Sequence, residues 1–195
     1  MTNRLHAWAR GLNPQLFPPT WREIEHFDLA WRDRIAVMAR LIQDEVTILD
    51  LGCGPMWLKE LLPEGKIYIG CDYVSRGEGT LVADFNQHQF PSVWADVCFV
   101  SGTLEYVRDV DWFLGETASS SPALLLSYCT TELRPGILRR RSYGWLNHMS
   151  RQTLLSKLAQ RGYGVTHEVR DDEGAYIVKA TRPEQDEARV ELGSG

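Results

Sequence analysis

Cysteine and histidine are scarce in this sequence, and neither occurs in the clusters that metal sites or disulfide scaffolds need. The four cysteines, Cys53, Cys71, Cys98 and Cys129, contain no C-x-x-C pair. The five histidines form no H-x-x-x-H motif and no cluster with cysteine. We therefore expect buried thiols and no metal site.

Long hydrophobic runs and an excess of positive charge are also missing. No apolar stretch approaches the ~20 residues that span a bilayer. The first ten residues, which include Arg4, His6 and Arg10, lack the apolar core of a signal peptide. The net charge of −5 gives no general attraction to nucleic acid or anionic lipid. We expect a cytoplasmic protein that binds neither nucleic acid nor membrane.

The 195 residues, 44% of them hydrophobic and 24% charged, suit one compact domain. Residues 1–27 place three prolines among aromatic residues and predict an irregular segment. Residues 28–181 carry the periodic patterns of a folded domain. Residues 182–195 are highly charged, lack aromatics and end in Gly-Ser-Gly, which predicts a disordered tail.

Short apolar runs alternate with helical patterns along the domain, as in α/β proteins with a parallel sheet. A final pair of strands joined by a turn predicts an antiparallel hairpin. We expect a mostly parallel, seven-stranded α/β sheet flanked by helices. The predicted strands are 46–51, 66–71, 81–83, 96–100, 123–128, 165–170 and 175–181, and the predicted helices are 28–43, 56–62, 110–119 and 151–161.

Chemistry-bearing residues follow the first four predicted strands, and ligands of open parallel sheets bind beyond the carboxyl ends of the strands. Gly52 and Gly54 allow close approach to the main chain. Asp72 lies ~20 residues beyond this glycine turn, where a carboxylate can accept hydrogen bonds from ribose hydroxyls. Asp84 suits an exocyclic amine of adenine, with Phe85 packed nearby.

With the segment Ser101-Gly102-Thr103-Leu104-Glu105 after the fourth strand, residues 28–181 resemble the class I S-adenosylmethionine-dependent methyltransferases. This resemblance implies S-adenosylmethionine as cofactor and methyl transfer to an oxygen or nitrogen of a small-molecule or carbohydrate-like acceptor. It implies that Gly52 and Gly54 line the methionine part, Asp72 binds ribose, Asp84 and Phe85 bind adenine, and Ser101 lies beside the sulfonium. Asp50 would orient the loop or reach the amino group through water. The full expected cofactor-binding set is Asp50, Gly52, Cys53, Gly54, Asp72, Tyr73, Asp84, Phe85, Ser101 and Gly102.

Two positions depart from the family pattern. Met56 replaces a third glycine that is often found in the first motif, and this leaves the path of the loop open. Tyr106 replaces a histidine of many relatives, so no role of that histidine transfers.

Other interpretations compete with each motif. The glycine pair alone suits a tight strand-to-helix turn, Asp72 and Asp84 suit caps, and Cys53 suits a small turn residue better than a nucleophile. A nicotinamide fingerprint is disfavoured because Trp57 stands where a third glycine is required. A non-catalytic partner or regulatory module with the same fold is the alternative function.

Residues for the acceptor are expected outside these motifs. His148, between the fifth strand and the last helix, is a candidate general base, with a capping or exposed histidine as the alternative. His26, Trp21, Phe27 and Trp31 line the other side of the pocket or pack in the core. The basic group Arg134, Arg139, Arg140 and Arg141 forms a solvated face or recognises an anionic acceptor.

Overall fold

One seven-stranded sheet organises the computed structural model, which describes residues 22, 25–171 and 174–183. The strand order is β3-β2-β1-β4-β5-β7-β6. The expected irregular segment 1–27 and tail 182–195 lie mostly outside the described residues, as does the middle of the expected turn 171–174. The strands are β1 (Thr47–Leu51), β2 (Ile67–Asp72), β3 (Leu81–Val82), β4 (Val97–Ser101), β5 (Ala123–Tyr128), β6 (Gly164–Arg170) and β7 (Tyr176–Thr181).

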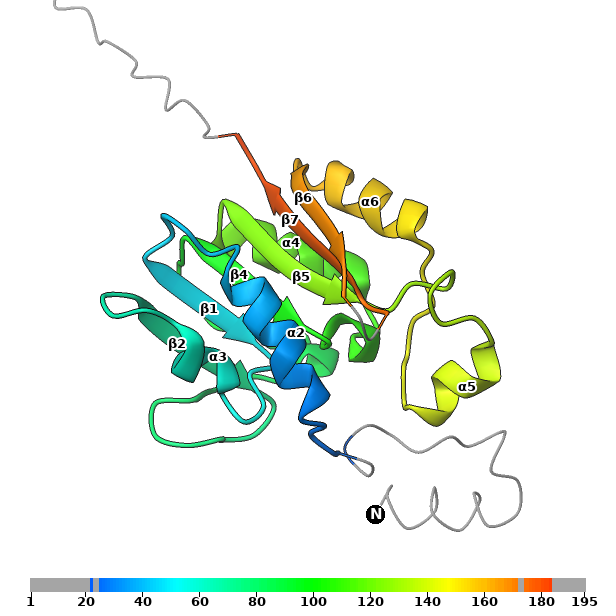
Figure 1. Ribbon diagram of the computed structural model, residues 1–195, viewed down its shortest axis with the longest axis horizontal. Coiled ribbons are helices and arrows are strands. Elements are labelled where there is room, and N and C mark those ends of the chain that lie inside the picture. The colour runs from blue at the N-terminus through cyan, green and yellow to red at the C-terminus, as the bar shows by residue number, and fades with distance from the viewer. Residues whose placement is uncertain (1–21, 23–24, 172–173, 184–195) are drawn as a thin grey trace, which may run out of the picture.

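Strands β1 to β5 are parallel, and β7 pairs antiparallel with both β5 and β6. The chain leaves β1 for β2 and β3 on one side and returns to β4 and β5 on the other (Figure 1). This reversal opens a crevice at the carboxyl ends of β1 and β4, where open α/β sheets bind ligands. The predicted fold class is confirmed, with strand boundaries differing by one residue or none.

Helices cover both faces of the sheet and produce two hydrophobic cores. Met38 of α2 (Ala30–Ala39) and Leu58 of α3 (Trp57–Leu61) pack on one face. Phe113 of α4 (Val110–Ser120) and Leu154 of α6 (Arg151–Gln160) pack on the other. Burial on both sides explains why the parallel strands read as continuous apolar runs.

Local capping fixes the helix boundaries. Asp109 accepts a hydrogen bond from the Trp112 amide at the start of α4, and Ser150 does the same for the Thr153 amide at the start of α6. The first helix is shorter than the expected 28–43: Asp28 accepts from the Ala30 amide, and helix α2 begins at Ala30. Tight turns after Ala39 end it.

A short helix, α5 (Ile137–Ser142), lies in the connection after β5, where the sequence pattern predicts no element, and Figure 1 shows it beside the sheet. Its Arg140 is 1% exposed. The guanidinium donates to the main-chain oxygens of Cys129, Thr130 and Arg134 and to the Tyr128 hydroxyl. Arg140 thus holds the connection in place and belongs neither to a solvated face nor to a free anion site.

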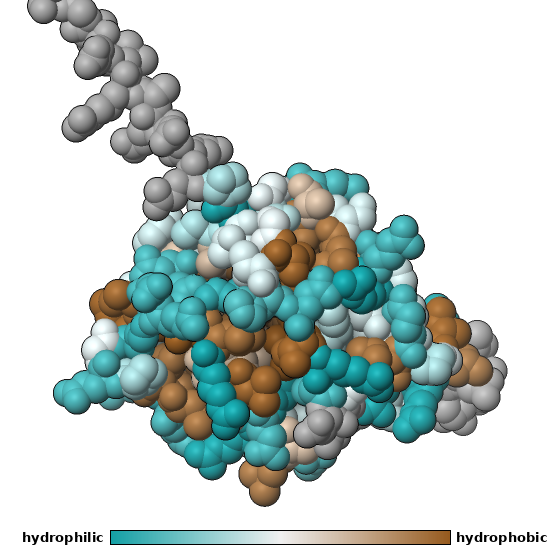
Figure 2. All heavy atoms as spheres, turned by 45° about the horizontal axis from the view of Figure 1, so that its top comes forward, coloured by the Kyte–Doolittle hydropathy of each residue, from teal (hydrophilic) through white to brown (hydrophobic). Residues whose placement is uncertain are grey.

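Two shorter 3-10 helices, η1 (Phe85–Gln87) and η2 (Leu104–Tyr106), follow β3 and β4 at the crevice. Among the described helices, none has the length and apolarity to cross a membrane. On the face in Figure 2, hydrophobic residues occur in several groups separated by hydrophilic ones.

Phe99 tests the core beneath α2, because it is fully buried on β4 next to β1 and β5. Phe99→Ala removes apolar burial and leaves a cavity, and we expect the free energy of unfolding to fall by about 3–5 kcal/mol in urea denaturation. Trp94→Ala, at a position 61% exposed, should change it by less than about 0.5 kcal/mol. Similar losses for the two variants would contradict this packing.

Candidate active site

A cavity of about 500 Å³ opens at the carboxyl edge of the sheet. Nine of the expected cofactor-binding residues line it: Gly52, Cys53, Gly54, Asp72, Tyr73, Asp84, Phe85, Ser101 and Gly102. Asp50 and His148 are not among the lining residues. Parallel strands bring these positions together because each motif directly follows a strand.

The glycine turn after β1 is tied to the end of β2. The amides of Gly52 and Cys53 donate to the Cys71 main-chain oxygen at 2.8 and 3.0 Å, and the Gly54 amide donates to the Asp72 carboxylate at 2.9 Å. Gly52 and Gly54 have φ values of 82° and 48°. Both lie in the left-handed region that glycine adopts without steric cost.

Met56 resolves the open question about the loop path. Its φ is 58° and its ψ is 33°, which is the left-handed conformation that a glycine would adopt easily. The chain therefore follows a glycine-like path at a position without glycine. Its side chain lies near the β2–β3 connection, where the sulfur accepts a weak hydrogen bond from the Thr80 hydroxyl.

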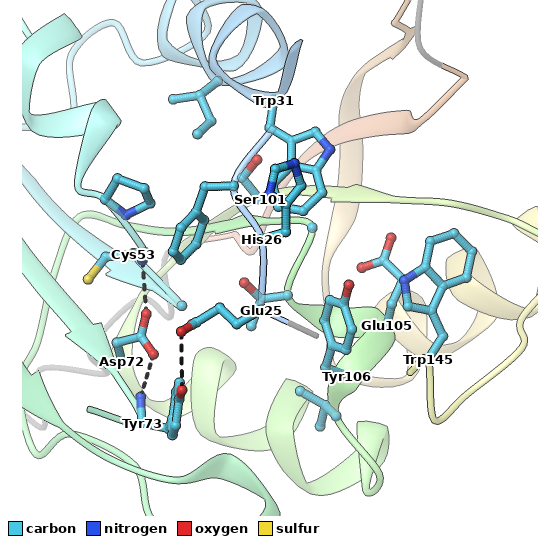
Figure 3. Close-up of a pocket in the computed structure, with 18 of the residues that line it drawn as sticks. Glu25, His26, Trp31, Cys53, Asp72, Tyr73, Ser101, Glu105, Tyr106 and Trp145 are labelled. Atoms are coloured by element: carbon cyan, nitrogen blue, oxygen red, sulfur yellow. Dashed lines mark hydrogen bonds between the residues drawn. The ribbon is translucent and has the colours of Figure 1, made fainter. Parts of the chain in front are cut away.

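Asp72 is the central acid of the cavity and is 5% exposed. Besides the Gly54 amide, its carboxylate accepts a hydrogen bond from the Tyr73 amide at 2.7 Å (Figure 3). It also accepts one from the Arg76 Nε at 3.0 Å. Arg76 also forms an ion pair with Glu25. A ligand hydroxyl that binds Asp72 must replace or share the Arg76 contact.

The carboxylate of Asp84 also has two kinds of partner. One oxygen caps η1 by accepting from the Asn86 amide at 3.1 Å, and the other is paired with Arg22. Phe85 lies at the edge of the core, with its ring centroid 5.0 Å from that of Phe113. Asp84 is thus positioned by a cap, and a ligand that binds its other carboxylate oxygen must compete with Arg22.

The segment before α2 forms the opposite wall. Figure 3 shows His26 beside Trp31 and Glu25 reaching toward Tyr73. His26, Phe27 and Trp31 all line the cavity, which agrees with the interpretation that they form a wall of the pocket. Trp21 lies outside the described residues. The Phe27 ring approaches so closely that a Cβ on Gly54 would be 2.8 Å from its Cε1. Gly54 is therefore required by this wall as well as by its backbone conformation.

The remaining wall combines Glu105, Tyr106 and Trp145 (Figure 3). Glu105 is 2% exposed, and its Oε1 accepts from the Cys129 amide at 2.8 Å, whereas Oε2 has no partner among the described residues. Burial raises the pKa of Glu105. Burial also raises the pKa of Tyr106 to about 12, against the effect of a hydrogen bond with Trp145. Sequence reasoning named Glu105 only as part of a motif and had no signal for Trp145.

His148 has a different neighbourhood from the one expected of a general base. Its Nδ1 accepts a hydrogen bond from the Arg140 Nε at 3.1 Å. Burial, followed by the charges of Arg140 and Arg141, lowers its pKa. The basic group is divided in the same region: Arg134 lines the cavity, whereas Arg139 is exposed and donates to the Tyr143 hydroxyl.

Asp50 lies beneath the glycine turn, 4% exposed, and accepts a hydrogen bond from the Tyr68 hydroxyl at 2.8 Å. Burial raises its pKa to about 7; the Tyr68 hydrogen bond opposes this shift and the charge of Asp72 adds to it. Within the described part of the chain, no three His, Cys, Asp or Glu side chains group as metal ligands.

The raised pKa of Asp50 predicts a pH-dependent stability. The folded protein binds the Asp50 proton more tightly than the unfolded chain does, because the pKa of Asp50 is near 3.8 when the chain is unfolded. The stabilisation that this proton gives is therefore fully present below about pH 4 and is lost as the pH rises through about 7. In urea denaturation, the free energy of unfolding of Asp50→Asn should therefore rise relative to that of the wild type by up to about 4 kcal/mol as the pH is raised from about 4 to about 7. Parallel stability curves for the two proteins would contradict the shift.

The comparisons with known proteins address the fold. No protein-family model matches the sequence, and no curated protein matches it either. Solved structures do match. A SAM-dependent methyltransferase from Thermotoga maritima, described as a possible histamine N-methyltransferase, has a TM-score of 0.63 and 15% identity, with 87% of this chain and 98% of that chain covered. The chain has the fold of the SAM-dependent methyltransferases.

Two further structures support the same fold. The N-terminal domain of EvdMO1, solved in the presence of SAH and D-fucose, has a TM-score of 0.57 and 18% identity, with 80% and 84% of the two chains covered. The O-methyltransferase NcsB1 from neocarzinostatin biosynthesis, in complex with S-adenosylmethionine and a hydroxy-methyl naphthoic acid, has a TM-score of 0.57 and 19% identity over 76% of this chain. This chain spans about half of NcsB1 and of another similar structure, 52% and 54% of their lengths.

Proposed function

We propose that the protein is an S-adenosylmethionine-dependent methyltransferase that acts on an oxygen or nitrogen of a small-molecule or carbohydrate-like acceptor. The observation that carries this proposal is the junction of the glycine turn, Asp72 and Asp84 around one cavity at the point where the strand order reverses. Structures of this fold that contain S-adenosylmethionine or SAH agree with the choice of cofactor.

The residues present fit such a cofactor. The cavity of about 500 Å³ lies within the usual range for ligand pockets. Gly52 and Gly54 line the cavity where the methionine end would lie, and Asp72 would offer its carboxylate oxygens to the ribose. Asp84 and Phe85 would hold the adenine, Tyr73 and Cys53 would border the nucleoside, and Ser101 and Gly102 would face the sulfur. Asp50 would act from below by holding the turn.

When bound, S-adenosylmethionine supplies a methyl group already activated on a sulfonium. The chain's task is then to align the acceptor and exclude water. Trp31, Tyr106 and Trp145 are half-buried aromatic residues that suit this task, because they present apolar surface on two walls of the cavity. The acceptor proton would leave to solvent or to a lining side chain such as His26. His148 would act by positioning Arg140, whose Nε donates a hydrogen bond to the His148 Nδ1.

One observation favours the alternative of a non-catalytic module. The carboxylates of both Asp72 and Asp84 are engaged by arginines of the chain itself, Arg76 and Arg22. If these pairs were permanent, the cavity would have no free acid for a nucleoside. Binding of the cofactor decides between the two functions, since it requires that these contacts yield.

Calorimetric titration with SAH, the demethylated product, tests the proposal. We expect the wild type to bind SAH and Asp72→Asn to bind it about 10- to 150-fold more weakly, because a charge-assisted hydrogen bond to ribose is lost. Asp33→Asn, an exposed change on α2 outside the cavity, is the matched control and should leave the affinity unchanged. No SAH binding by the wild type would favour the non-catalytic module, and equal affinities would remove Asp72 from the ribose site.

A further inference from the structure

Arg34 of α2 is a buried guanidinium that lines the cavity and is not explained by the cofactor motifs. The residue is 8% exposed. Its Nε donates to the Ser101 hydroxyl at 3.2 Å. Neither Nη1 nor Nη2 has a hydrogen-bond acceptor among the described residues, although Arg34 lines the cavity.

The fold provides a specific place for this group. Gly102 has a φ of 64°, and a Cβ on it would lie 2.7 Å from the Arg34 Nη2. The uncovered main chain at the end of β4 therefore lets the guanidinium lie against it. On its other side, the Trp31 ring centroid is 5.9 Å from the Arg34 Cζ. These contacts fix the guanidinium in position but leave its terminal donors unused.

Among the residues that the structure describes, no carboxylate forms an ion pair with Arg34. Glu105 is close enough for Arg34 to lower its pKa against the larger effect of burial, yet no oxygen of Glu105 lies within 4.0 Å to form an ion pair. The other cavity arginines differ: Arg76 is paired with Glu25 and Asp72, and Arg134 has an interaction of its own. A buried charge without a partner is costly, so a site for a complementary anion is the physical expectation.

We propose that Arg34 binds a carboxylate in this cavity, using the Nη1 and Nη2 fork beside Ser101 and Gly102. The planar fork matches the two oxygens of a carboxylate better than a single acceptor. The proposal rests on the methyltransferase function above, which brings two sources of such a group to the cavity. One is the amino-acid end of S-adenosylmethionine, and the other is an acidic acceptor molecule.

The cofactor arm compares SAH with 5′-methylthioadenosine, which keeps the nucleoside and the sulfur but lacks the amino-acid end. If the cofactor supplies the carboxylate, Arg34→Gln should weaken SAH about 10-fold or more and leave 5′-methylthioadenosine unchanged in calorimetry. Because both ligands are measured on the same variant, general damage to the fold would weaken both. Arg32→Gln is the matched control: Arg32 lies on the same helix but pairs with Glu60 outside the cavity, and neither affinity should change.

The acceptor arm uses protein saturated with SAH and compares benzoate with the neutral benzamide. If the acceptor supplies the carboxylate, the wild type should prefer benzoate about 10-fold or more, and Arg34→Gln should abolish this preference while SAH affinity is kept. Arg34→Lys should retain part of either effect, since it keeps the charge but loses the fork. The proposal is overturned if the wild type binds SAH and Arg34→Gln changes neither comparison. A wild type that binds neither nucleoside instead overturns the methyltransferase function.

Discussion

The contact between the Asp72 carboxylate and the Gly54 amide is the interaction on which the cavity depends. It connects the loop after β1 to the end of β2, and the two main-chain bonds from Gly52 and Cys53 to Cys71 reinforce the same connection. Burial of a carboxylate is costly unless its oxygens are hydrogen-bonded. The requirement to satisfy Asp72 therefore shapes the loop and fixes the floor of the cavity.

The same requirement explains the arginines around the cavity. Arg76 bonds Asp72, and Arg22 pairs with Asp84, so both acids are satisfied without any bound molecule. A nucleoside that enters must exchange these contacts for its own, and only the difference between the two sets contributes to affinity. Arg34 is the complementary case, because its terminal nitrogens have no acceptor to give up within the described part of the chain. The attraction of an anionic ligand group to Arg34 thus offsets part of the free energy that is lost when the contacts of Asp72 and Asp84 are exchanged.

Much of the fold could be predicted because the parallel strands are buried on both faces and end in recognisable turns. The run from Ala123 to Tyr128 has the same bounds in sequence and structure. Helix α5 could not be found, since it has six residues, three of them consecutive arginines, and no apolar face of useful length. Its stability comes from the burial of Arg140 against main-chain oxygens, which is a tertiary effect without a sequence pattern.

The cavity was predictable where its residues directly follow strands, and unpredictable where they come from elsewhere. Gly52, Asp72 and Ser101 share an edge because parallel strands end together. Arg34 and Trp145 reach the same space from a helix and a long connection, and only the packed chain brings them there. His148 illustrates the converse, because its place in sequence suggests proton transfer while its Nδ1 is occupied by Arg140.

A crystal structure of the protein with bound SAH would show whether the cavity is the adenosyl site. We predict the adenosyl group in the cavity, with ribose hydroxyls within about 3.2 Å of the Asp72 carboxylate and the Arg76 side chain displaced from its present contact. A nucleoside bound at another place, or a cavity still closed by the Arg76 and Arg22 ion pairs at saturating SAH, would contradict it.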